Sequence, residues 1–238
     1  MERGEEVFEE PLLSDVRAVA CETMRRVRHN IELLVPRLHQ LGYQFGAVPD
    51  DPDYWKNRPV LVPPPPDTRE AVKEVEDLVG TIPLSLRAWY EIVGGVNLIG
   101  LHSEWPETQE LDPLYVDPLC ASVSGCTTLE LIRSSYEDWK IDVEGFGVTE
   151  VGEFEIAMAP DFHHKVNVSG GPPYSFAPSH KAADVLLLHE WYETTFVNYL
   201  RICLRWGGFP GIKRCKNDVY KVNFLGHLPF LTQDFRPF

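Results

Sequence analysis

A long amphipathic helix is the first element that the pattern of apolar and polar positions predicts. Over residues 20–41 the apolar residues recur at alternating steps of four and three, which places them on one face of an α-helix. Ser14 is suited to cap this helix and Gly42 to end it, and Pro36 favours a kink because the stripe keeps its register past it. The stripe either covers the core of its own domain or forms a seam with a second chain. Its members are Ala20, Met24, Val27, Ile31, Leu34, Leu38 and Leu41.

A proline-rich connector follows over residues 46–67. Its four consecutive prolines, 63–66, hold an extended polyproline conformation and exclude a helix or a central strand. Such a run is either a recognition ligand or a stiff spacer between the helical arm and the body of the protein. Trp55 lies in this connector, and an aromatic residue in a loop is a candidate docked lid or contact residue.

Two short helices are predicted next. Asp67 and Glu70 have the spacing of a capping box at the start of the first helix, and Gly80 ends it. Pro83 suits the first turn of the second helix, which runs to a Gly-Gly pair and is followed by a strand over residues 96–99. The inward positions are Val72, Val75 and Val79 in the first helix, and Leu86, Trp89, Tyr90 and Val93 in the second.

The period of the pattern changes in the second half of the chain. Thr127 and Glu130 form another capping-box pattern before a helix, and residues 153–158 then alternate strictly, as in a half-exposed strand. Residues 165–168 and 174–176 are predicted as further strands of an antiparallel meander. A more buried strand, 185–188, precedes a last helix that ends at Gly207-Gly208. The inward positions of the two helices are Leu129, Ile132, Tyr136 and Trp139, and then Phe196, Leu200, Cys203 and Leu204.

This order of elements predicts an α+β fold. We expect a mainly antiparallel sheet flanked by helices, with a long N-terminal helical arm. The pattern divides the chain into an acidic tail (1–13), the helical arm with its proline-rich connector (14–66), an α+β domain (67–206) and a C-terminal extension (207–238).

The charge of the chain is concentrated in its middle third. The 238 residues carry a net charge of −14, and residues 81–160 hold fourteen acidic against three basic side chains. Such a field repels a nucleic-acid backbone and steers a cationic protein toward it. An acidic surface that merely keeps the protein soluble is the alternative interpretation.

Other features of the composition exclude further classes of protein. The longest aliphatic run, residues 185–188, is far shorter than the ~20 residues of a membrane-spanning helix. The acidic N-terminus lacks the apolar core of a signal peptide. The odd number of cysteines predicts a reducing cytoplasm rather than a disulfide framework, because they are scattered without a C-x-x-C pair; they are Cys21, Cys120, Cys126, Cys203 and Cys215.

Two segments of the chain form a recognisable pair. The first is G-T-I-P-L-S-L-R-A-W-Y at residues 80–90, running into V-G-G-V at 93–96; the second is the predicted closing strand and helix at 184–200. In this order they resemble the SUKH superfamily, which includes fungal cell-wall-assembly regulators and bacterial immunity proteins. The resemblance covers roughly residues 67–206. Val93-Gly94 stands where many members have Asn-Gly, and the arm and the extension lie outside the shared pattern. The resemblance implies a small α+β binding module and, in bacteria, neutralisation of a polymorphic toxin, often a nuclease, by direct binding.

Motifs for catalysis are weak. Asp161, His163 and His164 form the best candidate metal cluster, but two adjacent histidines on a strand would point in opposite directions. His189 begins an H-E-x-x-E sequence, which has Glu where a zincin helix needs a second His. The sequence therefore predicts no enzyme, no metal and no cofactor. A metal-dependent hydrolase at residues 161–164 is the third hypothesis, after a binding protein and a regulatory scaffold that self-associates through the stripe at 20–41.

The predicted partner is a cationic protein, and the predicted binding surface is the acidic segment over residues 101–144. Carboxylates there would accelerate encounter, and Trp105 or Trp55 would supply the anchor that slows release. The alternative is a solvated acidic loop with Trp105 packed in the core. The basic run 213–216 either answers an acidic patch, of the same chain or of a second copy, or is a solvated loop. The predicted partner-binding residues are Trp55, Glu104, Trp105, Glu107, Glu110, Asp112, Asp117, Glu137 and Asp138.

Overall fold

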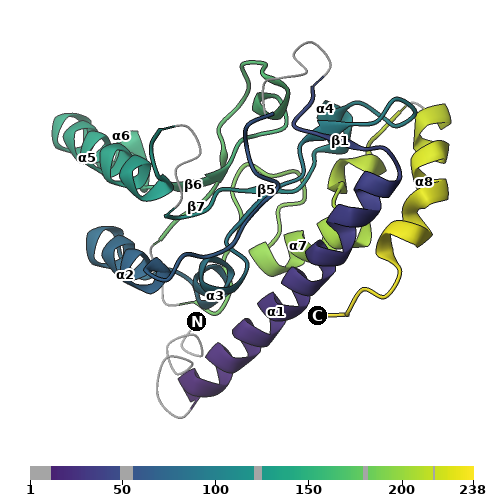
Figure 1. The fold of residues 1–238 in the computed structure, drawn as a ribbon. Helices are drawn as coiled ribbons and strands as arrows, with labels where there is room; N and C mark the ends of the chain where they lie inside the picture. The colour runs from purple at the N-terminus through teal and green to yellow at the C-terminus, as the bar shows by residue number, and fades with distance from the viewer. Residues whose placement is uncertain (1–11, 49–55, 121–124, 179–181, 217) are drawn as a thin grey trace.

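The long helix α1 (Leu12–Gln40) runs diagonally across the molecule (Figure 1). The structure is a computed structural model that describes residues 12–48, 56–120, 125–178, 182–216 and 218–238. The helix continues through Pro36, as predicted, and ends in a Schellman motif. Gly42 has a positive φ of 86°, and the N–H of Tyr43 donates to the carbonyl of Leu38 at 3.0 Å.

The apolar stripe of α1 is buried inside its own chain. Five of its members are at most 1% exposed, and Ala20 and Leu41 pack against the same core. The core of the protein is therefore built on this helix, which confirms the first interpretation of the stripe. The five buried members are Met24, Val27, Ile31, Leu34 and Leu38.

In the described residues, three small antiparallel sheets and a set of helices complete the α+β fold (Figure 1). The strands pair as β1–β4, as β2–β3–β5 and as β6–β7, with Val96 opposite Leu61 on one side and Val116 on the other. The strands are β1 (Gln44–Phe45), β2 (Leu61–Val62), β3 (Gly95–Asn97), β4 (Gly100–Leu101), β5 (Tyr115–Val116), β6 (Ile156–Ala159) and β7 (Tyr174–Phe176). The helices after α1 are α2 (Thr68–Val79), α3 (Leu84–Ile92), α4 (Thr108–Leu111), α5 (Thr128–Phe146), α6 (Val148–Val151), α7 (Phe196–Arg205) and α8 (Asp218–Thr232), with 3-10 turns η3 (His164–Val166) and η4 (Pro210–Lys213).

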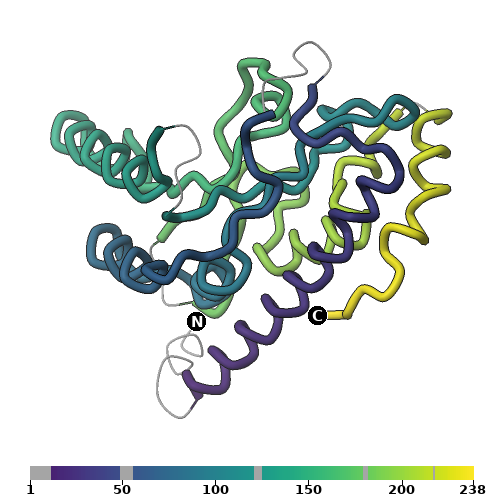
Figure 2. Tube along the Cα trace, in the orientation of Figure 1, coloured from purple at the N-terminus to yellow at the C-terminus, as the bar shows by residue number. Residues whose placement is uncertain are grey.

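The C-terminal segment folds back along α1 (Figure 2). The side-chain amide of Asn30 donates to the carbonyl of Arg236 at 2.9 Å and accepts from its N–H at 2.7 Å. In α8 the side chains of Phe224 and Leu231 are fully buried in the same core as the stripe of α1. Side chains from all three predicted segments beyond the tail thus share one core.

The predicted helices α2, α3, α5 and α7 are present, but one of the two capping boxes is not formed. At α5, Thr127 accepts from the N–H of Glu130 at 3.2 Å, and the Glu130 carboxylate accepts from the N–H of Thr127 at 2.7 Å. At α2, Asp67 has φ −88° and ψ 8°, and its side chain makes no capping hydrogen bond. A capping residue normally has an extended backbone, which directs its side chain at the free N–H groups, and Asp67 lacks it.

Two predicted strands are absent from the structure. Residues 165–168 form the end of η3 and a left-handed turn at Asn167, with φ 60°, because the alternating position Lys165 is drawn into the core rather than toward solvent. Residues 185–188 make isolated bridges, Ser175 with Leu188 and Leu186 with Thr195, rather than a regular strand. The predicted meander is therefore the single β6–β7 pair with loops on either side.

Candidate functional site

Trp105 is a core residue. Its side chain is 3% exposed, and its ring lies 5.0 Å from that of Phe224, 5.7 Å from Tyr43 and 5.9 Å from Phe209. The prediction that Trp105 is a contact anchor is corrected by this burial, and the alternative, a tryptophan packed in the core, is what the structure shows. Trp55 lies outside the described residues.

Asp112 and Asp117, two more predicted contact residues, face inward. The Asp112 carboxylate accepts from the Lys165 ammonium at 2.6 Å and from the Tyr174 hydroxyl at 3.0 Å, and both charged side chains are at most 1% exposed. Asp117 accepts from the Tyr115 hydroxyl at 2.7 Å, and burial raises the pKa of its carboxyl. Asp112 is therefore an interior residue that cannot contact a partner protein in this conformation, whereas Asp117 is half-buried and bonded to Tyr115.

The remaining predicted carboxylates lie on two separate parts of the surface. Glu104, Glu107 and Glu110 precede or belong to α4, whereas Glu137 and Asp138 are exposed on α5. Figure 1 places α5 on the opposite side of the molecule from α4 and α8. The acidic segment of the sequence is therefore not one continuous surface.

A hollow of about 530 Å³ lies beside α4 and is the candidate site. Its wall combines three parts of the sequence that were singled out separately: the acidic segment, the loop around residues 161–164, and the basic run 213–216. It also includes the loop 189–194 and the first turn of α8. Its size lies in the ordinary range of ligand pockets, roughly 300–1,000 Å³. The lining residues are Glu107, Gln109, Glu110, Phe162, Trp191, Arg214 and Tyr220.

Aromatic rings and one guanidinium group form one side of this hollow. The Trp191 ring lies 4.9 Å from the Phe162 ring, and Trp191 is 48% exposed. The guanidinium carbon of Arg214 lies 3.6 Å from the centre of the Trp191 ring, so the charged group sits directly over the ring. The basic run thus contacts an aromatic ring of its own chain through Arg214, and the charge pattern of the sequence had not indicated this contact.

Two carboxylates, Glu107 and Glu110, also line the hollow. The Glu110 carboxylate accepts a hydrogen bond from the Cys215 thiol at 3.3 Å, and thiols are weak donors. Glu107 is exposed, and its carboxylate makes no hydrogen bond or ion pair within the described part of the chain. These oxygens are accordingly available to a ligand that donates hydrogen bonds.

The loops around the hollow are held by buried polar groups. Glu190 accepts from the N–H groups of Tyr192 at 2.6 Å and Thr194 at 2.8 Å, which closes the loop that presents Trp191. His189 and Glu193, which flank this closed turn, have left-handed backbones with φ 67° and 48°. Backbone strain of this kind persists where surrounding contacts over-determine the conformation, as at binding sites.

The loop that carries Phe162 is organised by Asp161. Its carboxylate accepts from the N–H of His164 at 2.8 Å, from the ring of His164 at 2.6 Å and from the N–H of Gly171 at 2.6 Å. Burial raises the pKa of Asp161, but these hydrogen bonds outweigh burial and leave the pKa below its ordinary value. The ionised form is therefore the one that stabilises the loop.

Replacing Asp161 by Asn is expected to cost about 1–3 kcal/mol of stability at pH 7. The carboxylate uses one oxygen for the N–H of His164 and the other for the N–H of Gly171, whereas an amide has only one accepting oxygen. A carboxylate with a lowered pKa stabilises the folded state above its unfolded pKa of about 3.9, and that stability is lost as the pH falls through the folded pKa. Urea unfolding from pH 7 down to pH 2 should show the two proteins converging at the acidic end. A constant difference across that range would contradict the ionic role.

The histidines of the candidate metal cluster, His163 and His164, each have a partner within the protein. A ring nitrogen of His163 lies 3.0 Å from the side-chain amide of Gln109, and His164 contacts Asp161. Among the residues that the structure describes, no three His, Cys, Asp or Glu side chains are placed to hold a metal ion. The two histidines instead tie the Phe162 loop together and to α4.

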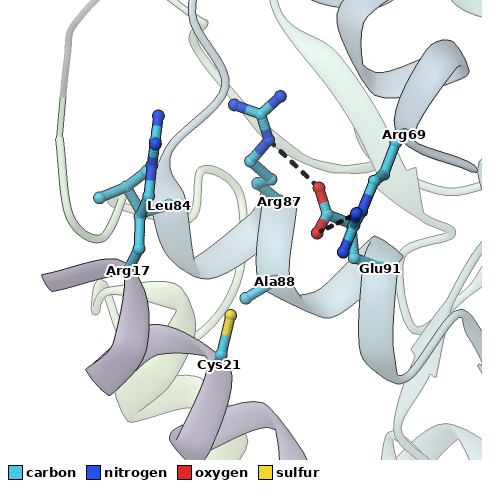
Figure 3. A pocket seen from close by; sticks show the side chains of 7 residues that line it. All are labelled: Arg17, Cys21, Arg69, Leu84, Arg87, Ala88 and Glu91. Atoms are coloured by element: carbon cyan, nitrogen blue, oxygen red, sulfur yellow. Dashed lines mark hydrogen bonds and ion pairs between the residues drawn. The ribbon is translucent and has the colours of Figure 1, made fainter. Parts of the chain in front are cut away.

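A second hollow, of about 280 Å³, lies between α1, α2 and α3 (Figure 3). Arg69 and Arg87 both point at Glu91, at 3.5 Å and 3.3 Å, and Arg87 also pairs with Glu76 at 3.2 Å. Arg17 and Cys21 of α1 form the facing wall. These arginines pair with carboxylates of α2 and α3, so we assign them to helix packing.

In comparisons with known proteins, no family model, no curated protein and no solved structure matches the chain. In the described part of the chain, no helix has the length and apolar character needed to cross a membrane.

Sequence reasoning found the carboxylates of the site but missed its aromatic side. Phe162, Trp191 and Tyr220 come from three loops or helix starts that are far apart in sequence. The sequence offered two signals of this side, a tryptophan in a polar loop (Trp191) and the basic run 213–216. Only the tertiary structure shows that the two are in contact.

Proposed function

We propose that this protein is a non-catalytic binding protein that captures a cationic segment of a partner protein in the hollow beside α4. The observation that carries the proposal is the combination of carboxylates (Glu107, Glu110) with aromatic rings (Phe162, Trp191, Tyr220) around one cavity. Carboxylates attract a cation over distance, and an aromatic face holds it once water has been displaced.

The biological role that we propose for this binding is that of a SUKH-like immunity protein, which acts in the cytoplasm on a cationic toxin such as a nuclease. The support for it is the resemblance of residues 80–96 and 184–200, together with the acidity of the chain. Binding of this kind needs a complementary surface and no chemistry. The scaffold hypothesis has less support, because the stripe it relied on is buried within the chain.

Charge reversal tests the proposed surface. The probe is a fluorescent peptide that contains both lysine and arginine, measured at about 0.01 M ionic strength, where exposed charges act over roughly 30 Å. Glu107→Lys with Glu110→Lys should weaken binding about tenfold or more, since each lost charge contact at a partly desolvated site is worth a factor of several.

A second double variant, Asp138→Lys with Asp142→Lys on α5, changes the net charge by the same amount on the other side of the molecule, where both side chains are exposed. It should weaken binding by a factor of two at most, because these charges lie on the far side of the molecule, where distance and the high dielectric constant of water leave only a weak interaction with the peptide. Equal losses in the two double variants would mean that the peptide responds to net charge alone, and the hollow would not be the binding site.

A further inference from the structure

We propose that the hollow beside α4 is a guanidinium site: it selects arginine over lysine in the partner, and the chain's own Arg214 covers its aromatic platform until the partner arginine displaces it. This inference rests on the proposed function, because it names the chemistry of the group that the same hollow takes.

The platform is Trp191 backed by Phe162. The guanidinium of Arg214 stacks on Trp191 at 3.6 Å, and Phe162, 4.9 Å from Trp191, is in turn 4.0 Å from the ring of His163. A guanidinium group is planar and weakly hydrated, so it can lie flat on a ring, whereas an ammonium group is compact and strongly hydrated. The stacking of Arg214 on Trp191 therefore shows how the guanidinium group of a ligand would lie on the platform.

The carboxylates beside the platform have no cationic partner in the parts of the chain that this structure describes. Arg214 is exposed and makes no ion pair with any described residue, although Glu107 and Glu110 line the same hollow. A guanidinium has five N–H donors in a fixed fork, which allows it to stack on a ring and donate to a carboxylate at the same time. Lysine offers a point charge and no flat face, so it would gain only the carboxylate side.

The walls of the hollow are fixed before a ligand arrives. Asp112, directly after α4, is joined to Lys165 of η3 by the buried 2.6 Å ion pair, which ties the carboxylate wall to the loop that carries Phe162. Glu190 closes the loop that carries Trp191. Rigid walls lower the ordering cost of binding, so the main barrier left is the removal of Arg214 from the ring.

Arg214 covers the platform in part of the molecules, and only molecules with a free ring can bind an arginine ligand. The apparent affinity for that ligand is therefore the intrinsic affinity multiplied by the fraction of molecules with a free ring. Removing that side chain should tighten binding of an arginine ligand. Removal of a positive charge would also tighten binding of any cation, so a matched control is needed. Lys216 is exposed in the same basic run and has no ring partner among the described residues.

The test compares two labelled peptides that differ only in carrying three arginines or three lysines, titrated against the full chain. We expect the arginine peptide to bind about tenfold more tightly than the lysine peptide, and Trp191→Leu to remove that preference, in keeping with the strength of guanidinium stacking on tryptophan. Arg214→Ala should tighten binding of the arginine peptide severalfold more than Lys216→Ala does. Thermal unfolding of each variant checks that the fold is retained.

The outcomes separate the inference from the function beneath it. Equal affinity for the two peptides, with both weakened by Glu107→Gln and Glu110→Gln, overturns arginine selection and leaves the cationic binding site standing. Equal effects of Arg214→Ala and Lys216→Ala overturn the covering role of Arg214. If neither peptide binds the wild type and neither binds the Arg214→Ala variant, the proposed function and the inference are both overturned.

Discussion

Asp112→Asn is expected to destabilise the protein by about 3–5 kcal/mol, the usual cost of breaking a buried ion pair by removing one charge. The variant keeps a side chain that tolerates the left-handed backbone at this position, where φ is 48°. It also keeps an acceptor for the Tyr174 hydroxyl. What it loses is the negative charge that balances the Lys165 ammonium, which is completely buried. Urea unfolding at pH 7 would measure the change in the free energy of unfolding.

Two further variants identify the cause of that loss. Asp138→Asn removes an exposed carboxylate from α5 and should change stability by less than about 0.5 kcal/mol. The double variant Asp112→Asn with Lys165→Met removes both charges and should recover part of the loss, because no uncompensated charge stays in the core. If the double variant is instead clearly less stable than Asp112→Asn, the loss in Asp112→Asn is not caused by the unbalanced charge of Lys165.

Deletion of residues 1–45 is expected to abolish cooperative unfolding and to leave a chain that aggregates. The deleted segment contains the five buried apolar side chains of α1, each worth ~1.5–3 kcal/mol when fully buried. Their sum is comparable to the whole stability of a typical domain, about 5–15 kcal/mol. The deletion also removes β1, the only strand that the described residues pair with β4. Calorimetry and light scattering would report the loss of the transition and the aggregation.

A point substitution tests the same contact without deleting a segment. Leu34→Ala should cost about 2–5 kcal/mol, since this fully buried side chain packs beneath the turn at Gly208. Val19→Ala on the same helix is the control, because its side chain is 66% exposed and should matter little. An unchanged melting temperature for Leu34→Ala would mean that α1 is a tail for a partner rather than part of the core.

Local pattern was enough for the helices α1, α2, α3, α5 and α7, but it did not predict α8 in the C-terminal extension and it failed for some of the strands. A helix of several turns repeats its apolar face many times, so the stripe of α1 and the inward residues of α3 could be read from spacing alone. The predicted strand at 165–168 rested on two alternations. It was wrong because Lys165 is buried by an ion pair with Asp112, 53 residues earlier. Alternation in a short segment cannot separate a polar residue that faces water from one that faces a buried partner.

The candidate site shows the same limit at the level of function. The sequence determined that the chain is acidic in its middle third and that it folds as α+β around a long amphipathic helix. It did not determine that Trp105 and Asp112 are buried while Phe162, Trp191 and Arg214 gather beside α4. Only the tertiary structure decided this, because the burial and electrostatic partners of a side chain depend on which distant segments pack against it. Composition and local spacing carry no record of that packing.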